Sequence, residues 1–72
     1  MSTREAQLTD RELEVIELVA HGLTNAQIAP RLFISEETVK SHLRHVTQKL
    51  RARNRAHIVG IVAMNSPHLL RR

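Results

Sequence analysis

The chain has 72 residues, with 11 Lys or Arg, 7 Asp or Glu and no cysteine. This length suits one small domain with a limited core, and the lack of cysteine excludes disulfides, thiolate metal sites and a catalytic thiol. No apolar run approaches the roughly 18 residues of a membrane span, and the N-terminus does not resemble a secretory signal, so we expect a cytoplasmic protein with no membrane partner.

The charge is distributed unevenly along the chain. Residues 1–37 carry three basic and seven acidic side chains, a net −4, whereas residues 38–72 carry eight basic side chains and no acid, a net +8. An acid-free half is a candidate footprint for nucleic acid, although a basic solvated tail is the commoner meaning of a charge run. One Phe and no Trp or Tyr leave little aromatic surface for stacking single-stranded bases.

The first predicted helix follows residues 1–7, which are polar, show no pattern and are expected to be disordered. Thr9 can cap this helix, and Glu12, three residues later, completes a capping box. Glu12 has a second interpretation, as an inward carboxylate paired with Arg55. Gly22 is predicted to end the helix in the left-handed conformation.

A second short helix is predicted over about residues 25–32, because Thr24 and Gln27 repeat the capping box. Pro30 lies beyond its first turn, where a proline removes a backbone hydrogen bond, so we expect a kink or a local irregularity there. Phe33 takes the turn position that often holds glycine, and a positive φ at this residue would be strained.

A third helix is predicted from residue 36, with Ser35 as its N-cap. Its apolar stripe consists of Val39, Leu43, Val46 and Leu50. The opposite face carries Glu37, Ser41, Arg44 and Gln48. Such a helix fits the DNA major groove, although the polar face of most amphipathic helices meets only water. With the preceding short helix it forms a helix-turn-helix, whose second helix enters the major groove.

A fourth helix is predicted after Asn54, its N-cap, and before Ser66 and Pro67. It holds more apolar residues than one stripe needs, including Ile58, Ile61 and Val62 on a shared face. The whole pattern predicts an all-α fold, a four-helix bundle containing a helix-turn-helix over residues 8–65, followed by a tail over residues 66–72.

The sequence resembles the LuxR/FixJ-type helix-turn-helix family over about residues 8–64. The resemblance rests on Leu8-Thr9-x-Arg11-Glu12-x-x-Val15, Gly22-x-Thr24-Asn25-x-x-Ile28-Ala29, Leu32-x-Ile34-Ser35-x-x-Thr38-Val39-Lys40-x-His42, Lys49-Leu50 and Arg55. It implies a DNA-binding effector domain of a transcriptional regulator, such as a response regulator, which usually follows a receiver or ligand-binding domain. Pro30 and Ser41 depart from the family pattern, and Ser41 bears on which operator is read.

The resemblance also implies roles for individual residues. The base-contacting positions are Lys40, Ser41 and Arg44. Caps, phosphate contacts or core-edge polar contacts occur in the family at the positions of Thr24, Asn25, Thr38, His42, Lys49 and Arg55. Of these, we predict phosphate contacts for Thr24, Asn25, Thr38, His42 and Lys49. By chemistry alone, Lys40 and Arg44 can each donate to guanine O6 and N7, with a phosphate contact as the alternative for Lys40. Glu37 can accept from cytosine, or it can stabilise the start of its helix through the macrodipole.

The expected partners are double-stranded DNA and a second copy of the chain, with RNA polymerase as a further candidate. A homodimer through Ile58, Ile61 and Val62 is expected to be weak without DNA. No cofactor and no enzymatic activity are expected, because the sequence shows no catalytic triad and no glycine-rich phosphate loop.

Three alternatives remain. His42 and His45 have a spacing that suits a shared metal, but no carboxylate or cysteine nearby completes a site. A helical module that binds a protein through the apolar face of the fourth helix is the main rival. Within DNA-binding proteins, a sigma-factor region-four domain shares a related helix-turn-helix.

Overall fold

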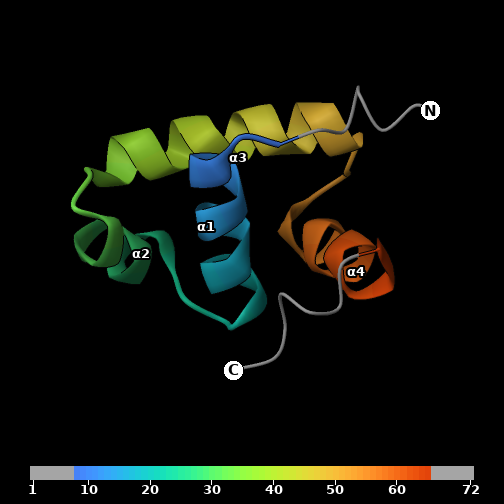
Figure 1. The fold of residues 1–72 in the computed structure, drawn as a ribbon, viewed down its shortest axis with the longest axis horizontal. Helices are drawn as coiled ribbons and strands as arrows, with labels where there is room; N and C mark the ends of the chain where they lie inside the picture. Colours follow the sequence, from blue (N-terminus) through green and yellow to red (C-terminus); the bar gives the residue numbers. More distant parts are fainter. Residues whose placement is uncertain (1–7, 66–72) are drawn as a thin grey trace.

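The computed structural model describes residues 8–65, which form four α-helices. They are α1 (Asp10–Ala20), α2 (Asn25–Leu32), α3 (Glu36–Leu50) and α4 (Arg55–Asn65). The longest helix, α3, lies across one side of the molecule, with α2, α1 and α4 arranged along it (Figure 1). The predicted all-α fold with a helix-turn-helix is confirmed. The predicted disordered segment and tail lie outside the described residues.

Side-chain caps start all four helices, as the sequence predicted. In α1 the Thr9 Oγ1 accepts from the Glu12 N–H at 3.1 Å, and the Thr9 N–H donates to Glu12 Oε1 at 2.9 Å. Thr24 and Gln27 form the same reciprocal box at the start of α2. Ser35 and Asn54 begin the remaining two helices by accepting from backbone N–H groups three residues later. These bonds satisfy N–H groups that have no partner within the helix.

The helix ends depend on left-handed residues. Gly22 has φ +89°, which confirms its predicted role after α1. Phe33 and Arg51 also have positive φ, 58° and 56°, and the second of these was not predicted. α2 continues through Pro30 to Leu32, so the helix is not interrupted at the proline. Pro30 is exposed, so water can hydrogen-bond to the backbone group that the proline leaves without a helical partner.

Two apolar clusters fix α3 along its length. Near its start, the buried cluster consists of Val15, Val19, Ile28, Ala29 and Val39. Near its end, the buried cluster consists of Ile16, Val46, Ile58 and Val62. Leu43 packs against both. Each fully buried Val or Ile contributes roughly 1.5–3 kcal/mol, so α3 is held rigidly between α1, α2 and α4 with its other side outward.

Burial corrects the predicted role of two α4 residues. Ile58 and Val62 are only 2% and 4% exposed and belong to the core, so neither side chain is available to a second protomer. Ile61 is half-buried. The helical period showed that these residues share a face, but α1 and α3 cover most of that face.

Candidate nucleic-acid interface

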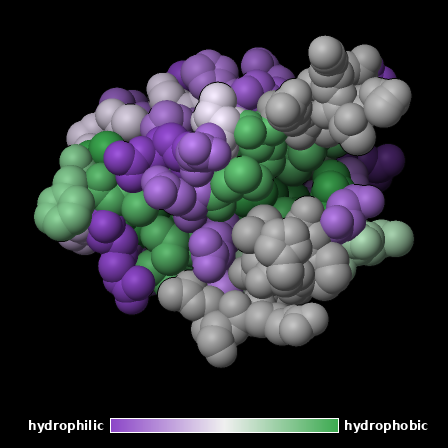
Figure 2. All heavy atoms as spheres, in the orientation of Figure 1, coloured by the Kyte–Doolittle hydropathy of each residue, from purple (hydrophilic) through white to green (hydrophobic). Residues whose placement is uncertain are grey.

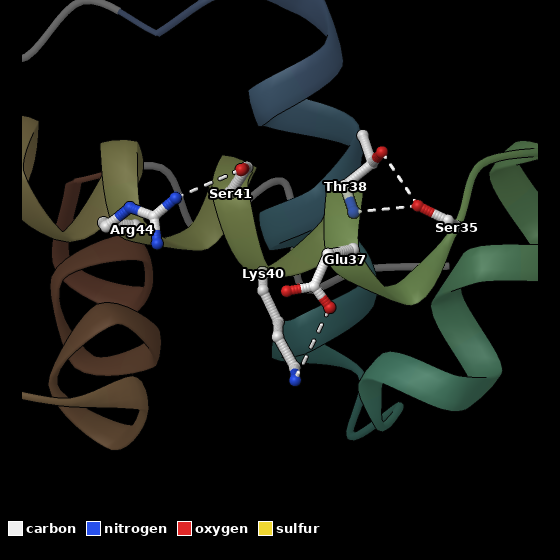
Figure 3. Close-up of polar contacts among 6 residues, drawn as sticks. All are labelled: Ser35, Glu37, Thr38, Lys40, Ser41 and Arg44. Atoms are coloured by element: carbon white, nitrogen blue, oxygen red, sulfur yellow. Dashed lines mark hydrogen bonds and ion pairs between the residues drawn. The ribbon is translucent and has the colours of Figure 1, made fainter.

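The outward face of α3 gathers the side chains predicted to contact bases. Lys40 and Arg44 are exposed, and Ser41 is half-buried between them in sequence. The Arg44 Nη2 donates to Ser41 Oγ at 3.2 Å, and the Lys40 Nζ lies 3.9 Å from Glu37 Oε1 (Figure 3). Hydrophilic side chains line the edge of the molecule over α3 (Figure 2). The structure therefore brings the three predicted base-contacting residues together on one accessible surface.

This surface has the chemistry of a major-groove reader. A guanidinium such as that of Arg44 can donate two hydrogen bonds to guanine O6 and N7, and the Lys40 ammonium can donate to either atom. The major groove is about 12 Å wide and admits one α-helix. The Ser41 hydroxyl already accepts from Arg44, so in the free protein it orients the guanidinium along the helix. That contact joins side chains three residues apart and was not predicted from the sequence.

The predicted phosphate contacts lie at several places around this surface. Thr24 caps α2, and the Thr38 Oγ1 lies 3.0 Å from Ser35 Oγ at the start of α3. Asn25 Oδ1 accepts from the Arg55 Nη1 at 2.8 Å. His42 is half-buried on α3. Thr24, Asn25 and Thr38 thus lie near the beginnings of α2 and α3, where backbone N–H groups favour an anion.

Arg55 joins the start of α4 to the turn before α2. Besides Asn25, it donates through Nη2 to the Leu23 carbonyl oxygen at 2.8 Å. The predicted Glu12–Arg55 pair is therefore wrong. Arg55 lies against the turn between α1 and α2, whereas Glu12 lies in the first turn of α1, under the far end of α3. The two hydrogen-bond partners of Arg55, Asn25 and Leu23, are 30 and 32 residues away in sequence, so no local spacing reveals them.

Glu12 pairs instead with Lys49. The Lys49 Nζ donates to Glu12 Oε1 at 2.7 Å, and the Glu12 residue is only 4% exposed. Burial by itself raises the pKa of Glu12, but hydrogen bonds from the Lys49 ammonium and from Thr9 outweigh it and hold the pKa below its ordinary value. Lys49 remains a predicted phosphate contact whose ammonium is already paired in the free protein.

We also searched residues 8–65 for a metal site and for a membrane-spanning helix. No group of three or more His, Cys, Asp or Glu side chains gathers there in a way that could hold a metal ion. None of the four helices is long and apolar enough to cross a lipid bilayer.

A short helix and a longer one joined by a tight turn, with the exposed Lys40 and Arg44 on the second, define a helix-turn-helix domain of the DNA-binding type. The chain also matches the family described as bacterial regulatory proteins, luxR family, over residues 6–62. It belongs to that family, and it is a DNA-binding domain of a transcriptional regulator.

The relatives are transcriptional regulators of bacteria. The chain is 56% identical over 48 residues to a nitrate/nitrite response regulator protein homolog of Haemophilus influenzae, covering 67% of this chain and 23% of that protein. It is 46% identical over 57 residues to the uncharacterized transcriptional regulatory protein YxjL of Bacillus subtilis, covering 79% of this chain and 26% of that protein. It is 47% identical over 49 residues to the nitrate/nitrite response regulator protein NarL of Escherichia coli, covering 68% of this chain and 23% of that protein. The chain spans about a quarter of the length of these curated relatives.

Proposed function

We propose that this domain binds double-stranded DNA sequence-specifically, with α3 in the major groove. The observation that carries the proposal is the placement of Lys40 and Arg44 on the outward face of a helix whose inward face is buried. Base reading needs side chains held in a fixed position, and the two core clusters supply that rigidity. The domain acts without enzymatic chemistry, as the reading part of a response regulator.

The proposed operator complex contains two copies of the chain, joined through α4. Because Ile58 and Val62 belong to the core, the available surface of α4 is its exposed face with Ala56, Gly60, Ala63 and Met64. Met64 is 84% exposed, and a Cβ added at Gly60 would meet nothing within 4 Å. Two α4 helices related by a twofold axis would set their α3 helices about one DNA turn apart, roughly 34–36 Å.

A protein-binding module is the second candidate function, and the burial pattern disfavours it. That function relied on surplus apolar residues of α4, and two of them, Ile58 and Val62, close the core instead. The exposed Lys40 and Arg44 of α3 have no role in such a module, whereas DNA binding uses both of them directly.

Fluorescence polarisation with a labelled random-sequence duplex tests the proposal. Binding should weaken steeply between about 50 and 200 mM salt, because each phosphate contact releases condensed counterions. Single-stranded DNA of the same composition is the matched control and should bind more weakly, since the chain has a single aromatic side chain for stacking. Absence of duplex binding at low salt, or binding that does not respond to salt, would refute DNA binding.

A further inference from the structure

We infer that Glu37 is a specificity-determining residue, which with Lys40 selects a C·G base pair under the first turns of α3. The inference rests on the proposed function and adds to it a carboxylate as a base-reading group. Glu37 Oε1 lies 3.9 Å from Lys40 Nζ, and in Figure 3 both side chains project from the same side of α3. An acceptor and a donor therefore stand next to each other on the surface that faces DNA.

The exposure of the pair argues against a structural role. The Glu37 side chain is 84% exposed and that of Lys40 is 58% exposed. Exposed ion pairs of this kind contribute little to stability, because water screens them and ordering two long side chains costs entropy. Both groups can therefore turn from each other towards a base edge at little cost.

A C·G pair matches this combination better than the other pairs do. In the major groove, the cytosine N4 amino group is a donor, and the guanine O6 and N7 beside it are acceptors. The Glu37 carboxylate can accept from N4 while the Lys40 ammonium donates to O6 or N7. Adenine also offers an amino group, but acceptors flank it on both sides, at its own N7 and at O4 of the paired thymine. Those lone pairs repel a carboxylate.

A carboxylate on a DNA-binding face also lowers the affinity for wrong sequences. Next to phosphates and guanine or thymine acceptors, the charge of Glu37 is repelled unless an amino group meets it. Sequences without the cytosine therefore bind more weakly, and discrimination comes from rejecting wrong sites as well as from holding the right one.

The neighbouring Glu36 provides a matched control. It has the same charge and also lies in the first turn of α3, so both residues stabilise the helix start through the macrodipole. Glu36, however, lines a surface depression together with Asn25 and Arg55, on the side of the turn before α2. Substitution of either glutamate by glutamine removes one negative charge, but only one of the two substitutions changes the Glu37–Lys40 pair.

In the experiment, the wild-type chain, Glu37→Gln and Glu36→Gln each select the duplexes that they bind from a random pool. The affinity of each protein is then measured for the selected duplex and for its single-base-pair variants. Wild type and Glu36→Gln should both prefer C·G at one position, with a loss on the order of tenfold when that pair is replaced. Glu37→Gln should lose that preference, keep the others, and bind unrelated duplex more tightly than wild type. Lys40→Ala should weaken the preference at the same pair.

A preference unchanged in Glu37→Gln would overturn the inference, and so would selection of A·T instead of C·G at the affected position. Either result leaves the proposed function standing, provided that the wild-type chain binds duplex DNA. Failure of the wild-type chain to bind any duplex refutes the proposed function itself. A circular-dichroism melt confirms that each variant is folded, as the exposure of both glutamates predicts.

Discussion

Lys49 and Glu12 join the last turn of α3 to the first turn of α1, with the Lys49 Nζ 2.7 Å from Glu12 Oε1. The same oxygen accepts from the Thr9 N–H, so one buried carboxylate holds together the start of α1 and the end of α3. Leu8 packs against the buried cluster that contains Val46. The orientation of α3 therefore depends on a polar contact as well as on apolar packing.

Replacement of Lys49 by methionine should lower the free energy of unfolding by about 1–3 kcal/mol, because it leaves a buried carboxylate without its charged partner. Urea titration measures the change. Arg11→Met is the matched control, since the Arg11–Glu14 pair is solvent-exposed and its loss should change stability by less than about 0.5 kcal/mol. Equal effects of the two substitutions would show that the Lys49–Glu12 pair does not stabilise the fold.

The loss of stability at acidic pH should be smaller in that variant than in wild type. In wild type the pKa of Glu12 is below its ordinary value of 4.5, so its contribution to stability is present above about pH 4.5 and is lost as the pH falls further. Without Lys49, both effects of its ammonium that lower the pKa of Glu12 are lost while the bonds from Thr9 remain, so that pKa should rise and Lys49→Met should lose less stability than wild type as the pH falls below about 4.5. Parallel stability curves over this range would contradict the pairing.

Local features of the fold could be predicted from the sequence, and long-range ones could not. The caps at Thr9, Thr24 and Ser35 involve residues three apart, so their spacing identified them. The partners of Glu12 and Arg55 lie 30 or more residues away and depend on how the helices pack. The period of α4 likewise identified an apolar face but not the neighbours that cover it.

Phe33→Gly should raise stability by roughly 0.5–1 kcal/mol, since a non-glycine residue pays about 1–2 kcal/mol in the left-handed region and glycine loses part of that gain through chain entropy. Phe33 has φ 58° and is 94% exposed, so little burial is lost. Thermal denaturation should show a rise of a few degrees. Phe33→Ala keeps a Cβ in the same conformation and should show no rise; a similar gain in both variants would mean that the backbone is not strained.

Arg44→Ala should weaken binding to a selected operator by about 1–3 kcal/mol and relax the preference at one base pair. Arg11→Ala removes the same charge from an exposed position on α1 that is not among the proposed DNA contacts, and it should leave the base preference intact. Competition with single-base-pair variants of the operator distinguishes the two outcomes. A uniform loss across all sequences in Arg44→Ala would assign that residue to phosphate contact.

Gly60→Glu should reduce the binding of a second protomer to a duplex with two half-sites, because it places like charges opposite each other across the proposed α4 interface. The position is open in the protomer, so the variant should fold, and Gly60→Ala is the matched control without a charge. Sedimentation with and without DNA should show mostly monomer in dilute solution and two wild-type protomers per duplex. A stable one-to-one wild-type complex would refute dimerisation on DNA.

The central claim, that the outward face of α3 contacts DNA, is tested most directly by NMR titration of the isotope-labelled chain with a selected duplex. The largest chemical-shift changes should fall on Lys40, Ser41 and Arg44, with small changes at the exposed Arg11 and Glu14 of α1. Large changes on α1 or α4, with the signals of α3 unmoved at saturating DNA, would contradict it.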